Sequence, residues 1–237
     1  MTLSGLSLDW LIGQLSPLRP GFWLLLSFIL SGLTLLAARF LPQKGIERLR
    51  IGRWIFTPYL GLLVGGLSPR LLGLSDIDWV AGLGLGVGLI FAIWLVLALV
   101  QATLHREEIA PELAHPSGRS LLGQIVWAGS QEFHWVFLRG AVWEMLLALP
   151  SPPALPGYWA IWLATLLALP GIFVQHRHTA QRVIAGMLLI TTAILFFYTR
   201  NFFLCWLLHA SAGLFVGYGV TKSHSPAQPS AQREPQR

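Results

Sequence analysis

Long apolar stretches alternate with short polar ones along most of this chain. A helix needs about 20 predominantly apolar residues to cross the hydrocarbon core of a bilayer. The pattern predicts seven such helices, over residues 21–40, 55–67, 79–100, 120–149, 157–175, 183–198 and 202–220. The expected fold is therefore an all-α polytopic membrane protein.

The segments between these helices differ in character. Residues 1–20 are expected to form a short interfacial segment, and the basic, weakly amphipathic stretch 43–54 is expected to lie on the membrane surface. Residues 105–119 read as a polar loop, and the tail 221–237, rich in Ser, Pro, Gln and Arg, as disordered. The helices thus fall into an N-terminal group at 21–104 and a second group at 120–220.

Composition supports a membrane location and argues against nucleic-acid binding and against a disulfide-stabilised fold. Of 237 residues, 54% are hydrophobic and 11% are charged, with a mean hydropathy of +0.63. The sixteen basic residues are spread along the loops, which predicts contact with anionic lipid and no nucleic-acid partner. A single cysteine, Cys205, excludes an intramolecular disulfide.

Lys and Arg are distributed unevenly between alternate loops, and cytoplasmic loops carry the excess of these residues. One side has three basic residues: Arg19, Arg70 and Arg200. The other side has twelve: Arg39, Lys44, Arg48, Arg50, Arg53, Arg106, Arg119, Arg177, Arg182, Lys222, Arg233 and Arg237. This asymmetry predicts a multi-pass protein with its N-terminus outside and its C-terminus in the cytoplasm.

The third predicted helix carries four glycines at alternate positions. Gly82 with Gly86, and Gly84 with Gly88, form two interleaved pairs of small residues four apart. Such pairs allow the backbones of membrane helices to approach closely. We expect this helix to pack tightly against a neighbour.

Placing an ionisable residue in the hydrocarbon zone costs free energy, so such a residue needs a partner, a wet cavity or a function. The fourth predicted helix contains Glu132, His134, Arg139 and Glu144. Helical geometry places Glu132 and Arg139 about 20° apart, on one face, and His134 about 140° from Arg139. Trp135, one turn before Arg139, is positioned for a cation–π contact with it.

Two histidines extend this set. His176 directly follows the fifth predicted helix, which Pro170 interrupts, and His209 lies in the middle of the seventh. A neutral imidazole inside an apolar helix still needs a hydrogen-bond partner across the bundle. We therefore expect Arg139, His176 and His209 to meet in a shared wet pocket.

Three stretches, 134–140, 171–176 and 198–213, resemble motifs of the CAAX prenyl protease and bacteriocin-processing (CPBP, or Abi) family of intramembrane proteins. The family's motifs read Glu-Glu-x-x-x-Arg, often ending in Phe-Arg-Gly, then Phe-x-x-x-His, then His-x-x-x-Asn. Arg139, His176 and His209 stand at matching positions. The resemblance covers residues 120–220 and implies a four-helix CPBP-like core.

The resemblance also implies an activity, that of a CAAX-type intramembrane endopeptidase. In active members the paired glutamates activate water, and the last His and Asn stabilise the oxyanion, without a metal. Here His134 and Trp135 stand at the glutamate positions and Gly213 at the asparagine position. The candidate catalytic residues are therefore Glu132, His134, Arg139, His176 and His209.

Three interpretations stay open. The first is a peptidase acting on a prenylated or membrane-anchored peptide, with Glu132 or His134 activating water. The second is an inactive family member that serves as a membrane-embedded binding or assembly factor for a membrane-protein partner. In the third, His134, His176 and His209 converge on Zn²⁺ or a tetrapyrrole. No cofactor is predicted, and Arg139 with Glu132 or Glu144 could equally form a purely structural ion pair.

Overall fold

A computed structural model describes residues 8–106, 120–176 and 178–223 of the chain, and within these ranges it contains helices and short links but no strand. The helices are α1 (Leu8–Gly13), α2 (Pro20–Ala37), α3 (Gln43–Val64), α4 (Trp79–Arg106), α5 (Leu121–Leu147), α6 (Pro156–Gln175), α7 (Thr179–Thr199) and α8 (Phe202–Ser223). The all-α prediction is confirmed for the described part of the chain.

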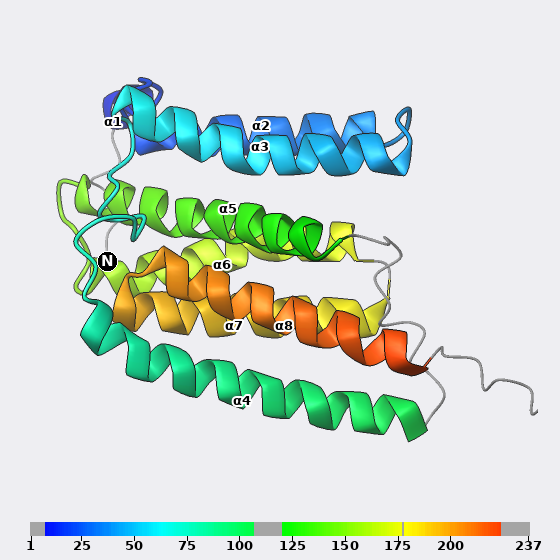
Figure 1. Cartoon of the computed structure of the whole chain (residues 1–237). Helices are drawn as coiled ribbons and strands as arrows, with labels where there is room; N and C mark the ends of the chain where they lie inside the picture. Colours follow the sequence, from blue (N-terminus) through cyan, green and yellow to red (C-terminus); the bar gives the residue numbers. More distant parts are fainter. Residues whose placement is uncertain (1–7, 107–119, 177, 224–237) are drawn as a thin grey trace, which may run out of the picture.

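The helices from α2 to α8 lie side by side, and consecutive ones run in opposite directions (Figure 1). The α2–α3 hairpin lies on one side of the bundle and α4 on the other. Helix α5 packs against α2, α3, α6 and α8, whereas α4 packs against α7 and α8. Helix α5 is thus central, and its residues from Trp135 to Trp143 are all buried.

Local sequence explains where α5 and α8 begin. The hydroxyl of Ser120 accepts a hydrogen bond from the Gly123 amide at 3.2 Å, and Asn201 Oδ1 accepts one from the Leu204 amide at 3.2 Å. Both are N-cap interactions, which satisfy amides that the first helical turn leaves without partners. These caps fix the starting points of two helices that build the site described below.

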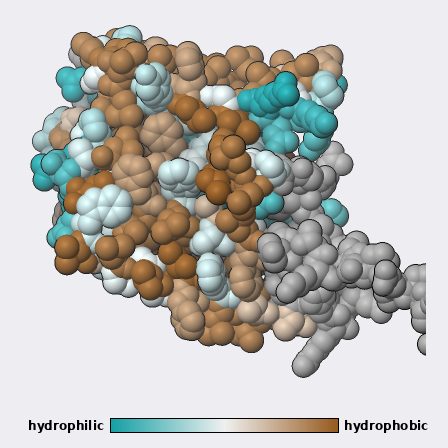
Figure 2. All heavy atoms as spheres, in the orientation of Figure 1, coloured by the Kyte–Doolittle hydropathy of each residue, from teal (hydrophilic) through white to brown (hydrophobic). Residues whose placement is uncertain are grey.

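Four helices are long and apolar enough to cross a membrane: α2, α4 over Trp79–Val100, α6 and α7. Helices α3 and α5 carry more ionisable residues, and the described apolar part of α8 is shorter, at Phe202–Phe215. Hydrophobic side chains dominate the face shown in Figure 2, and hydrophilic ones gather toward the ends of the bundle. These features indicate a membrane protein, and crossing by all seven long helices stays a prediction.

The prediction for residues 43–67 was wrong. A surface segment followed by a separate span was expected, but α3 is one helix from Gln43 to Val64 that continues through Pro58. Neighbouring residues accommodate Arg53: its Nη1 donates to the Ser31 hydroxyl on α2, and its guanidinium lies 5.6 Å from the Trp54 ring centroid. The helix ends at Gly65, which adopts the left-handed conformation (φ 82°) typical of a C-cap.

The other boundaries differ by a few residues. Helix α6 contains Pro170 without interruption, and α4 continues past Val100 to Arg106. Most of the predicted polar loop (107–119) and of the predicted disordered tail (224–237) lies outside the described residues. The predicted interfacial segment contains α1, and its residues 1–7 also lie outside.

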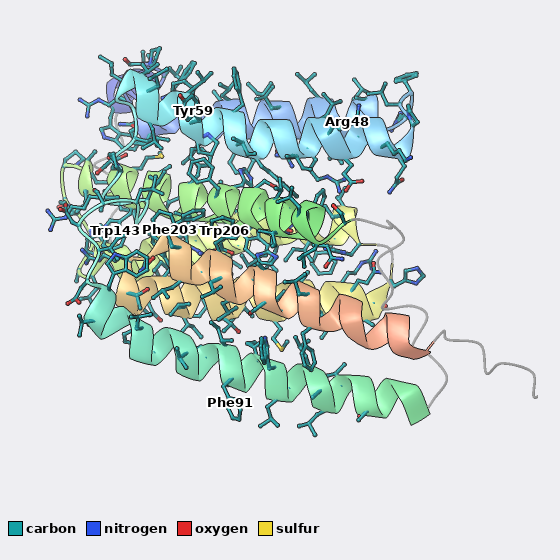
Figure 3. All side chains as sticks on the ribbon, in the orientation of Figure 1. Arg48, Tyr59, Phe91, Trp143, Phe203 and Trp206 are labelled. Atoms are coloured by element: carbon teal, nitrogen blue, oxygen red, sulfur yellow. The ribbon has the colours of Figure 1, made fainter. Side chains whose placement is uncertain are left out.

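One of the two predicted glycine pairs lies at a helix contact. A Cβ atom on Gly82 would come within 3.0 Å of a Leu204 methyl group on α8, and one on Gly86 within 3.3 Å. Gly84 and Gly88 have nothing within 4 Å at that position, so their pair does not pack against another helix. Further along α4, Phe91 points away from the bundle (Figure 3).

Candidate functional site

Glu132 and Arg139 form a buried ion pair on α5. The guanidinium Nη1 donates to Glu132 Oε1 at 2.9 Å, and the side chains are 0% and 1% exposed. The predicted common face of these residues is confirmed, and the partner of Arg139 is Glu132 rather than Glu144. Because the two residues are seven apart on one helix, backbone geometry alone brings the charges together.

His209 approaches this pair from α8. Its Nδ1 lies 3.2 Å from Glu132 Oε2, and its ring stacks on Trp135 with 4.9 Å between centroids and 22° between planes. The expected partner across the bundle is therefore the Glu132 carboxylate. The predicted contact of Trp135 with Arg139 was wrong, since the guanidinium lies over the ring of Phe196, 5.6 Å from its centroid.

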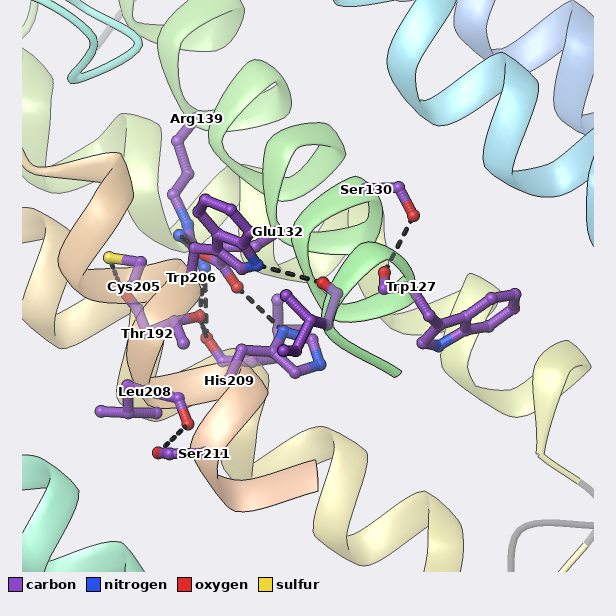
Figure 4. A network of polar contacts seen from close by, with 12 residues as sticks. Trp127, Ser130, Glu132, Arg139, Thr192, Cys205, Trp206, Leu208, His209 and Ser211 are labelled. Carbon is purple, nitrogen blue, oxygen red and sulfur yellow. Dashed lines mark hydrogen bonds and ion pairs between the residues drawn. The ribbon is translucent and has the colours of Figure 1, made fainter. Parts of the chain in front are cut away.

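Helix α7 supplies the remaining contacts. Nη2 of Arg139 donates to the Thr192 hydroxyl at 2.9 Å and to the Leu189 carbonyl at 3.3 Å. The Cys205 thiol in turn contacts the Thr192 carbonyl at 3.5 Å. We call Glu132, Arg139, Thr192 and His209 the Glu132 cluster; it joins α5, α7 and α8 (Figure 4). Thr192 was not predicted, because a threonine in an apolar helix is common and does not by itself indicate a polar site.

His134 faces the opposite side of α5. Its ring lies between those of Trp54 on α3 and Phe137, with centroid distances of 6.2 and 5.8 Å. Its Nδ1 is buried and has no hydrogen-bond partner. The third interpretation, in which His134, His176 and His209 converge on one point, was wrong. His134 lies on α5 about 140° from Arg139, whereas His209 contacts Glu132 on the Arg139 face.

His176 lies at the end of α6 rather than in the Glu132 cluster. It is the C-cap residue of α6, and its carbonyl accepts a hydrogen bond from Arg182 Nε at 2.8 Å. The described side-chain partners of the Glu132 carboxylate are Arg139 and His209. Within the described ranges, no three His, Cys, Asp or Glu side chains lie close enough together to hold a metal ion.

A second polar site lies on the His134 side of α5. A cavity of about 310 Å³ is bounded by α2, α3, α5 and α6, and we call it the Arg53 chamber. Four of its lining residues carry a buried polar atom without a hydrogen-bond partner: Arg53, Trp54, His134 and Gln175. Sequence reasoning missed this chamber because it placed residues 43–54 on the membrane surface.

Comparisons of the chain with protein-family models, with curated proteins and with solved structures gave no significant match. The resemblance to the CPBP family therefore depends on the matched residues alone. The chemistry of the two polar sites has to be argued from their own geometry.

Proposed function

We propose that this chain is a multi-pass membrane protein that uses a CPBP-like helical core as a binding scaffold and does not hydrolyse peptides. In this proposal α2 to α8 all cross the membrane, α5 to α8 form the core, and the N-terminus lies outside with the C-terminus in the cytoplasm. The binding partner is a membrane component, and the Glu132 cluster stabilises the core.

The observation that carries the proposal is that the Glu132 carboxylate is buried and has a partner at each oxygen. A general base must reach the proton that it removes, at about 3 Å or through one water. Glu132 has no exposed surface, one of its oxygens accepts from Arg139 and the other contacts His209. A carboxylate held in this way favours a structural ion pair over activation of water.

The positions of His134 and Trp135 support the same view. They stand where the family's glutamates would be, but His134 packs between two aromatic rings and Trp135 covers His209. Neither an indole nor an imidazole enclosed by aromatic rings supplies the paired carboxylates that the family's mechanism uses. Gly213, at the asparagine position, has no side chain to stabilise an oxyanion.

A peptidase assay on the purified full chain in proteoliposomes tests this proposal. With a fluorogenic farnesylated CAAX peptide, we expect no cleavage above that of protein-free vesicles. Glu132→Gln and His209→Ala should reduce the yield of folded protein and leave this background unchanged. Cleavage that is lost in both variants but kept in Asp76→Asn, a matched change at an exposed carboxylate, would overturn the proposal.

One observation favours the peptidase as a second candidate. The separation of 3.2 Å between Glu132 Oε2 and His209 Nδ1 is that of a carboxylate–imidazole pair, in which the carboxylate orients the ring and stabilises its charged form. In that case His209, and not Glu132, would take the proton from water. The peptidase assay separates the two candidates, because a catalytic Glu132–His209 pair predicts cleavage by the unmodified chain, whereas the binding scaffold predicts none.

A further inference from the structure

We propose that the Arg53 chamber binds an acidic phospholipid from the cytoplasmic leaflet, with the phosphate at Arg53 and an acyl chain against the apolar wall. The proposal deepens the proposed binding function and rests on it. It names the ligand class and a site on the His134 side of α5, separated from the Glu132 cluster by Trp135, which lines the chamber and stacks on His209.

The unsatisfied polar atoms identify the head group. Arg53 and Trp54 line the chamber, and each has one buried polar atom, Arg53 Nε and Trp54 Nε1, without a hydrogen-bond partner. Both atoms are donors only, so a ligand that satisfies them must present acceptors. Trp54 is 1% exposed, so its indole N–H has no access to bulk solvent. A buried polar group without a partner costs free energy, which a bound acceptor would recover.

The charge of the residues that line the chamber indicates that the acceptor is an anion. Arg50 and Arg53 both line the chamber, and its described lining contains no aspartate or glutamate. An arginine guanidinium binds phosphate through a planar fork of donors. Arg53 Nη1 donates to the Ser31 hydroxyl, which holds the side chain in place, while Nε has no hydrogen-bond partner. His134 and Gln175 are the other two lining residues with a buried atom that has no partner. Gln175 Oε1 is an acceptor and needs a donor, such as a hydroxyl of the head group.

The walls identify the rest of the ligand. Helices α2 and α6 both bound the chamber over α5, and several of their apolar lining residues are also exposed on the outside of the bundle: Phe28, Leu35, Leu166, Leu167 and Val174. The chamber is therefore continuous with the surface that would face acyl chains. A volume of about 310 Å³ holds roughly ten water-sized groups at about 30 Å³ each, enough for an acidic head and the first part of one chain.

Position along the bundle identifies the leaflet. Arg50 and Arg53 belong to the first half of α3, and Gln175 is the last residue of α6. Helix α6 ends, and α3 begins, at the end of the bundle where α2 joins α3, which is the basic, cytoplasmic end in the proposed topology (Figure 1). Arg53 lies at the middle of α3, so the chamber extends from the middle of the bundle toward this end. Basic pockets between helices on the cytoplasmic side suit acidic head groups.

Native mass spectrometry of the full chain tests the proposal. Protein in mild detergent is offered phosphatidylglycerol or phosphatidylcholine with identical acyl chains, and the retained lipid is counted. We expect one phosphatidylglycerol per chain, held about tenfold more tightly than phosphatidylcholine, a difference of about 1.4 kcal/mol. Both lipids carry the same anionic phosphodiester, but the choline of phosphatidylcholine would bring a cation close to Arg50 and Arg53. Arg53→Gln should remove this preference.

A matched variant controls for total charge. Arg48 belongs to the same helix, is exposed and does not line the chamber, so Arg48→Gln removes the same charge and should keep the preference (Figure 3). Trp54→Phe keeps an aromatic ring but removes the indole N–H, which has no hydrogen-bond partner, and we expect weaker phosphatidylglycerol retention. Circular dichroism melting identifies variants that fail to fold.

The following results would contradict the assignment of the chamber to an acidic phospholipid. Equal retention of the two lipids, or equal losses in Arg53→Gln and Arg48→Gln, would show that the chamber is not an acidic-lipid site. If the chain retains oleate through Arg53 but does not retain phosphatidylglycerol, the ligand is a free fatty acid and the phospholipid proposal is wrong. These outcomes are independent of the peptidase assay, which tests the proposed function through Glu132 and His209.

Discussion

Neutralising Glu132 leaves Arg139 as an uncompensated buried charge. Breaking a buried ion pair on one side costs about 3–5 kcal/mol. We therefore expect Glu132→Gln to lower the free energy of unfolding by about that amount in a denaturant titration of the detergent-solubilised protein. Asp76→Asn is the control, because the Arg70–Asp76 pair spans 3.6 Å with both side chains about two-thirds exposed. Such an exposed pair contributes at most about 1 kcal/mol.

Removing both charges should cost less than removing one. When a buried ion pair is replaced by apolar residues of similar volume, the desolvation penalty disappears with the attraction. The double variant Glu132→Leu with Arg139→Met should thus be more stable than Glu132→Gln. Equal stabilities for the two would contradict a mutual charge pair and would point to the contacts of Arg139 with α7 as the main contribution.

Cys205 offers a direct readout of whether the bundle is closed. Its thiol is completely buried beside Thr192, and it is the chain's one cysteine. A thiol reacts with a maleimide only where the reagent can reach it. We expect negligible labelling of the unmodified protein under native conditions and faster labelling of Glu132→Gln, measured by mass shift over time. Rapid labelling of the unmodified protein would contradict the packing of α7 against α8.

The residues of the site were predictable where they share one helix. The spacing of Glu132 and Arg139 fixes their common face, and the polarity of His209 in an apolar helix required a partner, which the structure supplies as Glu132. The contacts that depend on how separate helices dock were not predictable. Trp135 lies one turn from Arg139 and yet stacks on His209, since the position of α8 decides which ring it meets.

At the scale of helices, Gly82 and Gly84 give a matched pair of positions on α4. Gly82 is buried against Leu204 of α8. Gly84 is exposed, and a Cβ atom added to it would have no neighbour within 4 Å. Gly82→Ile should lower stability by about 1–3 kcal/mol through overpacking, and Gly84→Ile should change it little. Thermal unfolding of the two purified variants measures the difference, and similar midpoints would contradict the close approach of α4 to α8.

Most helices were predictable to within a few residues because apolar length is a strong signal. Helix α3 was not, since its first half carries Lys44, Arg48, Arg50 and Arg53 and resembles a surface helix by composition. The Arg53 charge is tolerated because α2 supplies a hydroxyl, Trp54 supplies a ring face, and a chamber lies beside it, whereas Lys44 and Arg48 are exposed. These are properties of the assembled bundle and have no counterpart in the local sequence.

At the scale of the whole molecule, the alternating directions of α2 to α8 place their links at two ends of the bundle (Figure 1). Four of the twelve basic residues on the predicted cytoplasmic side belong to α3 rather than to a loop: Lys44, Arg48, Arg50 and Arg53. Without them the sequence still assigns eight basic residues to that side and three to the other. The charge rule counts residues close to the ends of spans, so the proposed orientation is unchanged. Seven crossings would put the two termini on opposite sides of the membrane.

Labelling of introduced cysteines tests this orientation without a fusion partner. In a Cys205→Ala background, Ser151→Cys places a thiol in the exposed link between α5 and α6, and Lys44→Cys places one at the exposed start of α3. A membrane-impermeant maleimide should label position 151 in intact cells and position 44 only after permeabilisation. The reverse pattern would invert the proposed topology and assign the Arg53 chamber to the outer leaflet, and labelling of both positions in intact cells would mean that the helices between them do not cross the membrane an odd number of times.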